Sequence, residues 1–294
     1  MRSYLYVPGD APAKLDKALD RGADALIVDL EDAVPLAGKA RARAIVAAWL
    51  SDLPAAGPAG PAPGPAVWVR VNPGPAGFDD VRAVVGPRLA GICLAKAGSA
   101  AEVAALGTVL AAAEEERGLP VGAVPVVPLL ETATAVLDAA QIARAPRVAR
   151  LQIGEADLRA ELGVTLGPDE RELLFVRSQV VLASAAAGIA APVASVSTDY
   201  RDLPALRAST AAFRRLGFVG RACIHPAQIP VVNEVFTPSP VEIAVAADLV
   251  ERFDAAVSSG AGVLVGADGR MVDAAVVRAA RRVLDLAGAT ADPR

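Results

Sequence analysis

The stretch Leu151–Gly163, LQIGEADLRAELG, joins a short apolar run to two closely spaced carboxylates. The apolar run ends at Gly154, and Glu155 and Asp157 follow where a helix would begin. Carboxylates in the first turn of a helix often cap its free N–H groups. Carboxylates are also the protein ligands that Mg²⁺ prefers. The stretch therefore allows two interpretations, a structural cap or a metal site.

The residue types that the chain lacks restrict its chemistry. It has one histidine, His225, and two cysteines, Cys93 and Cys223. Zinc sites need more His and Cys ligands than these. Both cysteines lie in apolar, strand-like runs that are typical of buried thiols. A Ser-His-Asp or Cys-His mechanism would depend on His225 alone. We therefore expect catalysis by carboxylates, lysine, arginine and a hard metal ion.

The composition excludes several classes of function. A formal net charge of -4 without any basic cluster argues against binding to nucleic acid. A membrane span would need a run of about 18 uncharged apolar residues, and the chain has none. The first residues, MRSYLYVPGDAPAK, lack the apolar segment of a secretory signal. We expect a cytoplasmic protein with no nucleic-acid or membrane partner.

Short apolar runs alternate with segments whose apolar residues have helical spacing. This repeated alternation predicts a parallel sheet closed into a (β/α)₈ TIM barrel. A doubly wound open sheet also alternates, but eight units favour the barrel. The predicted strands are Tyr4–Val7, Ala25–Leu30, Val67–Val71, Gly91–Ala95, Ala123–Leu130, Val148–Ile153, Pro192–Val196 and Arg221–Ile224. The clearest helical segments are Lys14–Arg21, Lys39–Leu50, Ala100–Arg117 and Leu203–Leu216.

Two segments interrupt the alternation. The Pro-, Gly- and Ala-rich segment Pro54–Ala66 predicts a surface loop. The TPSP sequence predicts a break, after which two further helices are expected near Val241–Val257 and Ala274–Ala287. We therefore expect a barrel domain over residues 1–237 and a short C-terminal helical extension over residues 238–294.

Polar residues follow nearly every predicted strand, and the active site of a TIM barrel lies at those strand ends. Glu131 could instead be a first-turn helix carboxylate, Lys96 a solvated surface lysine and His225 a hydrogen-bonded rim residue. Arg70, inside the apolar VWVRVN, is expected to have a functional or ion-pair role. The complete set is Gly9, Asp10, Asp29, Glu31, Asp32, Arg70, Asn72, Lys96, Glu131, Gly154, Glu155, Asp157, the SVSTD segment and His225.

Several motifs, taken together and in order, resemble the citrate lyase β-subunit-like family of the HpcH/HpaI aldolase superfamily. They are RSYLYVPGD, KALDRGADALIVDLEDAV, VRVN, LLETA, IGEADLRAELG, RRLGFVGRACIHPAQIPVVNEVFTPS and ADGRMVDA. The resemblance covers nearly the whole chain. It implies a (β/α)₈ barrel that forms a homotrimer, binds Mg²⁺, and cleaves or forms a carbon–carbon bond between an acyl-CoA and a 2-oxo acid.

The resemblance also implies roles for individual residues. Glu131 of LLETA and Asp157 of EADL match the ligands of Mg²⁺, which Mn²⁺ could replace. Arg70 of VRVN matches an arginine that faces the substrate oxygens. Asp273 of GRMVDA matches an acid/base that enters the active site of the neighbouring subunit, on which the C-terminal extension would then pack. The structural alternative is that Asp273 caps the helix beginning at Ala274.

Other contacts to the substrate are expected near Gly154. Gly154, Glu155 and Ala156 are the candidates, because the main-chain N–H groups after Gly154 would face the substrate carboxylate at a helix N-terminus. CoA phosphates would meet basic side chains, for which the candidates are Lys14, Lys17 and Arg221. The chain departs from the family in GEADL where GxEDL is frequent, in Arg221 where lysine is common, in AKA at Lys96 where PK is frequent, and in Ala274 where proline is usual.

The resulting prediction is a Mg²⁺-dependent lyase acting on a 3-hydroxyacyl-CoA such as malyl-CoA or citramalyl-CoA. Two other enzymes remain as alternatives. One is a citrate lyase β subunit acting on a citryl thioester of an acyl-carrier protein, and the other is a malyl-CoA thioesterase. A catalytically silent barrel that only binds acyl-CoA is the non-enzyme alternative, and Glu131, Asp157 and Arg70 argue against it.

Overall fold

The computed structural model describes residues 1–54, 64–259, 264–265 and 271–291. Contacts within the chain divide it into two compact units, Arg2–Asn233 and Glu234–Arg294, the second including Met1. The division lies within helix α10 (Ile229–Phe236), whereas the sequence suggested a boundary at 237/238. Most of the predicted surface loop, over 55–63, lies outside the described residues.

The first unit is a closed barrel of parallel strands in sequential order, β1 to β8, which confirms the predicted fold class. Pairing of β1 with β8 closes the ring, with Ser3 opposite Arg221. The predicted strand from Val148 is shorter than expected, because Val148 makes only an isolated bridge to Val126. The strands are β1 Ser3–Pro8, β2 Ala25–Asp29, β3 Ala66–Val71, β4 Leu89–Leu94, β5 Val126–Leu130, β6 Gln152–Ile153, β7 Val193–Ala194 and β8 Gly220–Cys223.

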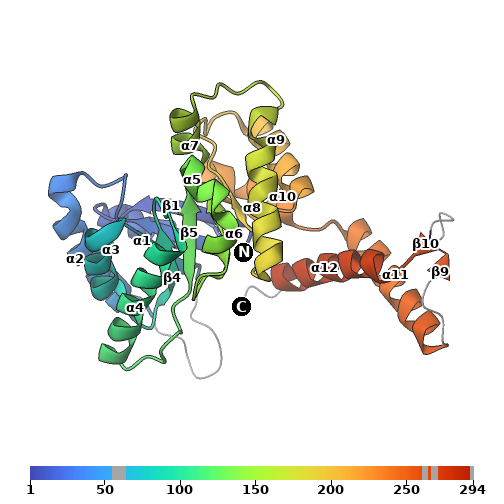
Figure 1. Cartoon of the computed structure of the whole chain (residues 1–294), viewed down its shortest axis with the longest axis horizontal. Coiled ribbons are helices and arrows are strands. Elements are labelled where there is room, and N and C mark those ends of the chain that lie inside the picture. Colours follow the sequence, from blue (N-terminus) through green and yellow to red (C-terminus); the bar gives the residue numbers. More distant parts are fainter. Residues whose placement is uncertain (55–63, 260–263, 266–270, 292–294) are drawn as a thin grey trace. The chain divides into compact units, whose positions relative to one another are not determined.

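Helices follow the strands and lie outside the barrel (Figure 1). Helix α9 shows how the sequence sets their ends. Asp202 accepts a hydrogen bond from the Ala205 N–H at 2.9 Å, and Gly217 ends the helix at a positive φ of 105°. The helices are α1 Pro12–Ala18, α2 Lys39–Asp52, α3 Gly74–Val84, α4 Ala100–Glu116, α5 Ala133–Leu137, α6 Ala139–Ala143, α7 Glu155–Leu162, α8 Leu174–Ala187, α9 Leu203–Leu216 and α10, with 3₁₀ turns at Leu36–Gly38, Arg171–Leu173 and Pro226–Gln228.

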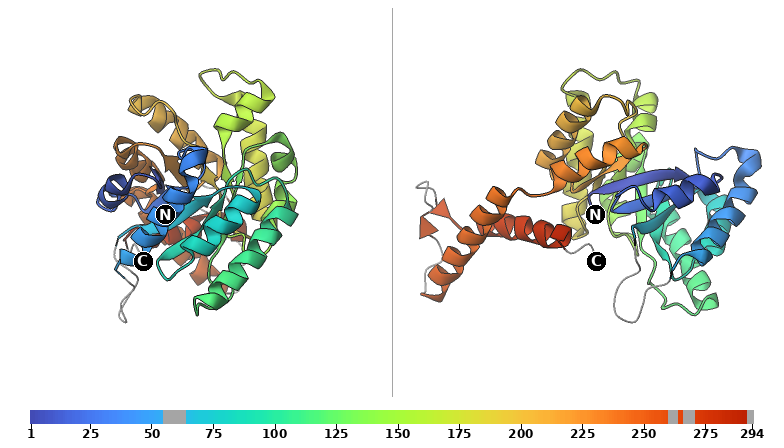
Figure 2. Two further views of the ribbon diagram at one scale, coloured as in Figure 1. Left: turned by 90° about the vertical axis from the view of Figure 1, so that its left-hand side faces the viewer. Right: turned by 180° about the vertical axis from the view of Figure 1, so that it is seen from behind.

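An apolar cluster fills the N-terminal half of the barrel interior, with the enclosing helices visible in Figure 2. Strand side chains alternate between the two faces, so residues two apart point the same way. The cluster members Tyr4, Ile27 and Trp68 therefore precede the inward-facing Tyr6, Asp29 and Arg70 on their strands. This cluster closes the N-terminal end of the barrel, and polar side chains gather on the C-terminal side of it. Its members are Tyr4, Ala25, Ile27, Trp68, Cys93, Val127 and Val193.

The described part of the second unit holds the end of α10, two further helices and a short antiparallel strand pair. Helices α11 (Pro240–Ser258) and α12 (Ala274–Ala291) pack on each other. Strands β9 (Leu264–Val265) and β10 (Met271–Val272) pair between them, which the sequence did not predict. Ser239 begins α11 with a capping box. Within the described parts of the chain, every helix is too short or too polar to cross a membrane.

Candidate active site

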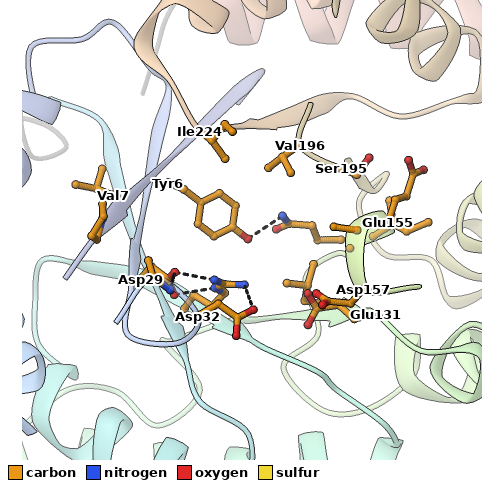
Figure 3. A pocket seen from close by; sticks show the side chains of 18 residues that line it. Tyr6, Val7, Asp29, Asp32, Glu131, Glu155, Asp157, Ser195, Val196 and Ile224 are labelled. Atoms are coloured by element: carbon orange, nitrogen blue, oxygen red, sulfur yellow. Dashed lines mark hydrogen bonds and ion pairs between the residues drawn. The ribbon is translucent and has the colours of Figure 1, made fainter. Parts of the chain in front are cut away.

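A cavity of about 450 Å³ lies at the C-terminal ends of the barrel strands (Figure 3). Such a volume suits a small ligand. Its walls come from β1, β2, β3, β5, β6 and the residues that follow β6, β7 and β8. The polar lining residues are Tyr6, Asp29, Asp32, Arg70, Glu131, Gln152, Glu155, Asp157 and Ser195. The structure thus brings most of the predicted strand-end residues into one place.

Arg70 is buried in the cavity wall and surrounded by three carboxylates. Its Nε and Nη2 donate to Asp29 at 2.7 and 2.6 Å, and its Nη1 lies 3.2 Å from Glu31 and 4.0 Å from Asp32. Burial lowers the pKa of Arg70, but the hydrogen bond to Asp29 and the nearby negative charges together raise it. A guanidinium has five N–H donors, so one N–H on each terminal nitrogen is left for a ligand. Arg70 therefore remains charged and keeps two N–H donors.

The carboxylates around Arg70 are fixed by the turn that follows β2. The Asp29 side chain accepts hydrogen bonds from the N–H groups of Glu31 at 2.8 Å and Ala33 at 3.0 Å. Lys39, from the start of α2, donates to the carbonyl oxygens of Leu30 and Glu31. The DLED segment is thus wrapped around its own first carboxylate, and this places Asp29 and Glu31 rigidly against the arginine.

Lys96 joins the two acidic groups of the site. Its main chain has a positive φ of 49°, and its N–H donates to the Glu131 carboxylate at 2.8 Å. Its ammonium group donates to Glu31 and, at 3.0 Å, to Asp32. Burial lowers the pKa of Lys96, but the hydrogen bonds and charges of Glu31 and Asp32 together raise it, so the group stays charged. Lys96 is therefore ion-paired, with 38% of its side chain exposed.

Glu131 and Asp157 present their carboxylates side by side in the cavity (Figure 3). Glu131 is 4% exposed and precedes the N-cap of α5, Thr132, so it is not a first-turn residue. Asp157 lies in the first turn of α7 but makes no capping hydrogen bond. Burial raises the pKa of Glu131 to about 8, and the negative charge of Asp157 adds to the effect. The first-turn alternative for Glu131 is therefore wrong, whereas Asp157 is a first-turn carboxylate that also lines the cavity.

This pair of carboxylates fits a bound Mg²⁺. A divalent cation would offset the burial and mutual repulsion that raise the pKa of Glu131. Among the described residues, no three His, Cys, Asp or Glu side chains are grouped to hold a metal ion. Mg²⁺ is commonly held by one or two carboxylates, with water and substrate oxygens completing its shell. Glu131 and Asp157 would supply those two.

Gly154 is needed for the approach of α7 to Glu131. A Cβ atom on Gly154 would lie 2.4 Å from Cγ of Glu131, which no side chain can accommodate. Gly154 donates to the Leu130 carbonyl at 2.9 Å and is the N-cap of α7 without a side-chain cap. The N–H groups at the start of an uncapped helix are available to an anion. Gly154, Glu155 and Ala156 all line the cavity, and because the Gly154 N–H is bonded to Leu130, the N–H groups of Glu155 and Ala156 are the candidates for the substrate carboxylate.

The side chain of Glu155 is committed to a different partner from that of Asp157. Arg177 on α8 donates to both of its carboxylate oxygens, at 2.6 and 2.8 Å, and also to Glu170 at 2.7 Å. The guanidinium lies 4.2 Å from the ring centroid of Phe213. Only the main chain of Glu155 is therefore available to a substrate. Sequence reasoning missed Arg177, although a lone arginine in the apolar FVRSQVV was a usable signal.

The three residues predicted to contact CoA differ in their exposure in the structure. Arg221 is 3% exposed and donates to the Ser195 carbonyl at 2.9 Å and to Thr210 at 2.7 Å. Burial lowers its pKa to about 10. The prediction that Arg221 meets a CoA phosphate is wrong, because its guanidinium is enclosed by the protein. Lys14 and Lys17 are exposed on α1 and do not line the cavity.

Two further candidates have local structural roles. His225 accepts a hydrogen bond from the Ala227 N–H at 3.1 Å and stacks on Tyr200, so it is a hydrogen-bonded rim residue. Asp273, in the second unit, accepts from the N–H groups of Ala275 at 2.8 Å and Val276 at 3.1 Å. It therefore caps α12 in the single chain. An acid/base role in a neighbouring subunit stays a prediction.

Known proteins are similar to this chain in sequence and in architecture. The HpcH/HpaI aldolase/citrate lyase family model matches residues 2–226. The citrate lyase subunit beta-like protein of Deinococcus radiodurans is 36% identical over 97% of this chain and 96% of its own. A (3S)-malyl-CoA thioesterase of Cereibacter sphaeroides is 35% identical over 99% of this chain and 95% of its own. The crystal structure of CitE from Mycobacterium tuberculosis, in complex with magnesium, acetoacetate and coenzyme A, superposes with a TM-score of 0.74 at 32% identity and covers 98% of each chain. The chain belongs to the HpcH/HpaI aldolase/citrate lyase family.

Proposed function

We propose that the protein is a Mg²⁺-dependent carbon–carbon lyase that cleaves or forms a 3-hydroxyacyl-CoA such as malyl-CoA or citramalyl-CoA. The products of cleavage are an acyl-CoA and a 2-oxo acid. The observation that carries this proposal is the placement of Glu131, Asp157 and the charged Arg70 in the lining of one cavity. A relative with the same fold binds magnesium, acetoacetate and coenzyme A together.

The proposed reaction divides its work among a few groups. Bound Mg²⁺ would supply Lewis-acid polarisation of the substrate oxygens, held by Glu131 and Asp157. The two remaining N–H groups of Arg70 donate to the hydroxyl oxygen as it becomes the oxo group. The N–H groups at the start of α7 bind the carboxylate of the oxo-acid part. These donors are fixed before the substrate arrives, so little reorganisation is needed during the reaction.

Proton transfer completes the proposed cycle. A base removes the hydroxyl proton of the substrate, the carbon–carbon bond breaks, and its electron pair passes to the thioester as an enolate. Protonation of the enolate carbon then gives the acyl-CoA. We assign the base to Asp273 of a neighbouring subunit in a homotrimer, because the resemblance to the family implies this role, and several barrel carboxylates already have partners. Asp29 and Glu31 are bonded to Arg70, and Glu155 is bonded to Arg177.

The decisive experiment is a panel of 3-hydroxyacyl-CoAs incubated with the protein and Mg²⁺. Lyase activity releases an acyl-CoA and a 2-oxo acid in equal amounts. A thioesterase, the function named for the Cereibacter relative, would release free CoA and leave the carbon skeleton whole. Activity confined to a citryl thioester of an acyl-carrier protein would identify a citrate lyase β subunit. Release of none of these products would overturn the proposal and favour a barrel that only binds acyl-CoA.

The proposed assembly and location can be measured separately. A homotrimer would have a mass about three times the 29.8 kDa of one chain, measurable by light scattering.

Lys14 and Lys17 remain candidates for CoA phosphates, and neutralising both should raise the KM for the CoA thioester without changing turnover. Cell fractionation would test the expected cytoplasmic location.

A further inference from the structure

Tyr6 and Gln152 form a polar pair on the floor of the cavity. The Gln152 Nε2 atom donates to the Tyr6 hydroxyl at 3.1 Å, from β6 to β1 (Figure 3). Both residues line the cavity, and Gln152 is 2% exposed. Neither has a part in the function proposed above. Because their strands are far apart in the sequence, the pair exists only once the barrel has closed.

The depth of the pair restricts which part of a substrate can meet it. The Tyr6 ring packs against the apolar cluster that closes the barrel below. The Arg70 guanidinium lies 5.0 Å from the centroid of the same ring. The pair thus lies next to the groups proposed to hold the 2-oxo acid. The CoA portion is far larger and has to extend out through the open mouth of the barrel.

The Tyr6–Gln152 pair leaves a hydrogen-bond donor without an acceptor. Gln152 donates to Tyr6, which leaves the phenolic proton without an acceptor among the described residues. If the Gln152 amide were rotated, the phenol would donate to it and the amide N–H groups would be left over. At least one donor therefore remains in either arrangement, and a buried donor is costly unless water or a ligand oxygen accepts from it.

The phenol also remains a donor across the physiological range. Burial raises the pKa of Tyr6, and this outweighs the lowering effect of the nearby Arg70 charge. A neutral O–H group beside a charged arginine favours an oxygen atom as its partner over an apolar group. Among the groups of the proposed substrates, the oxygens of the small 2-oxo acid meet this requirement at this depth.

We propose that Tyr6 and Gln152 are substrate-binding residues that donate a hydrogen bond to the 2-oxo acid and do not contact the CoA portion. This inference rests on the proposed lyase function. It assigns the floor of the cavity to the oxo acid and the mouth to the thioester.

Isosteric substitutions test the pair. Tyr6→Phe and Gln152→Met keep the volume of each side chain and remove its polar atoms. We expect either variant to raise the Kd of Mg²⁺-loaded protein for pyruvate or glyoxylate by about tenfold, the loss of one buried hydrogen bond. The double variant should lose little more than either single one, because the two residues act together. In the condensation direction, the KM for acetyl-CoA should stay the same.

Tyr4→Phe is a matched control. Tyr4 lies on the same strand and face, and its hydroxyl accepts a hydrogen bond from Arg150 at 2.9 Å. It is buried in the apolar cluster and does not line the cavity. Tyr4→Phe should therefore leave oxo-acid affinity unchanged, while showing what the loss of a buried tyrosine hydroxyl does to the fold. Circular dichroism and unfolding curves would be recorded for every variant.

Several outcomes would overturn the inference. Unchanged oxo-acid affinity in a folded Gln152→Met variant would do so, even if Tyr6→Phe failed to fold. An equal loss in Tyr4→Phe, or a loss confined to the KM for acetyl-CoA, would also contradict it. If the wild-type protein bound no 2-oxo acid, the inference and the lyase proposal would fall together. If it bound the acid through Tyr6 and Gln152 but formed no carbon–carbon bond, only the lyase proposal would fail.

Discussion

At the scale of single residues, the shape of a charged group matters as much as its charge. Asp29 accepts from Nε and Nη2 of Arg70 and Glu31 lies beside Nη1, which leaves one N–H on each terminal nitrogen for a ligand. A lysine ammonium has no such planar fork. The same reasoning separates Asp157, which faces the cavity, from Glu155, which is bonded to Arg177. One turn of helix thus assigns two neighbouring carboxylates to different tasks.

Arg70→Lys should reduce turnover by about 10²–10³-fold, the usual effect of losing a fixed donor to a developing oxyanion. Steady-state kinetics would show the loss in kcat, with a smaller change in KM. Arg43→Lys is the control, because Arg43 pairs with Asp80 at 2.8 Å and does not line the cavity. A rise in KM alone would mean that Arg70 contributes only uniform binding, contrary to the role assigned here.

Glu131→Gln and Asp157→Asn should each abolish activity that depends on Mg²⁺ or Mn²⁺, because each removes one of two anionic ligands. Electron paramagnetic resonance of Mn²⁺ would measure the lost affinity directly. Asp10→Asn should bind Mn²⁺ normally, since Asp10 follows β1 without lining the cavity. Full activity of any of these proteins in excess EDTA would remove the metal ion from the mechanism.

At the scale of elements, the barrel follows from the sequence more readily than the contacts inside it. The strands are apolar runs bounded by turn residues, so a local pattern identifies β2 and β5, which are buried on both faces. The ion pair of Arg177 with Glu155 and the hydrogen bond of Gln152 to Tyr6 join residues that are 22 and 146 positions apart. No local pattern specifies such pairs, because they depend on which side chains the closed barrel brings together.

The same limit explains the errors at single positions. Arg221 was a candidate for CoA phosphates because its side chain is basic. In the structure it points between β7 and α9, where backbone and hydroxyl oxygens surround it. The strand pair β9–β10 was missed because each strand has only two residues. Arg70 stood out as a charge in an apolar strand, whereas Glu131 and Asp157 were chosen because the family motifs mark them, since spacing alone would not have separated these two from helix caps.

Helix α7 offers a prediction at this scale, because its first residue is anchored by Arg177. Arg177→Met should destabilise the protein by about 3–5 kcal/mol, since it leaves the buried Glu155 charge without its partner. Adding Glu155→Gln should recover part of that loss, because no charge is then left buried. Urea unfolding of the two single variants and the double variant would measure the coupling. Additive losses would mean that the ion pair does not anchor the helix.

At the scale of the whole molecule, Asp273 links the second unit to the proposed chemistry. It caps α12 within its own chain. Asn caps helices about as well as Asp, so Asp273→Asn should fold and bind Mg²⁺ normally. Loss of a general base should nevertheless lower the rate by about 10²–10⁴-fold. Thermal unfolding, Mn²⁺ binding and single-turnover rates would distinguish the two roles.

Mixing two inactive variants tests whether the site is shared between subunits. Asp273→Asn and Arg70→Ala would each be inactive alone. In a mixed trimer some sites would combine an intact Arg70 from one chain with an intact Asp273 from another, and activity should return. Subunit exchange would be verified by mass spectrometry of differently tagged chains. Persistent inactivity after complete exchange would show that each chain works alone or that Asp273 has only its capping role.

The close contact of Gly154 with Glu131 also determines which substitutions of Gly154 are compatible with activity. Every other amino acid has a Cβ atom, and one at this position would lie 2.4 Å from Glu131 Cγ. Any missense mutation there should therefore be lost under selection for activity, including mutation to alanine. A Cβ atom on Gly22 would meet no atom within 4 Å, so this position should accept asparagine despite its positive φ of 75°. A saturation mutagenesis screen for activity should then recover no substitution at Gly154 and should recover asparagine at Gly22.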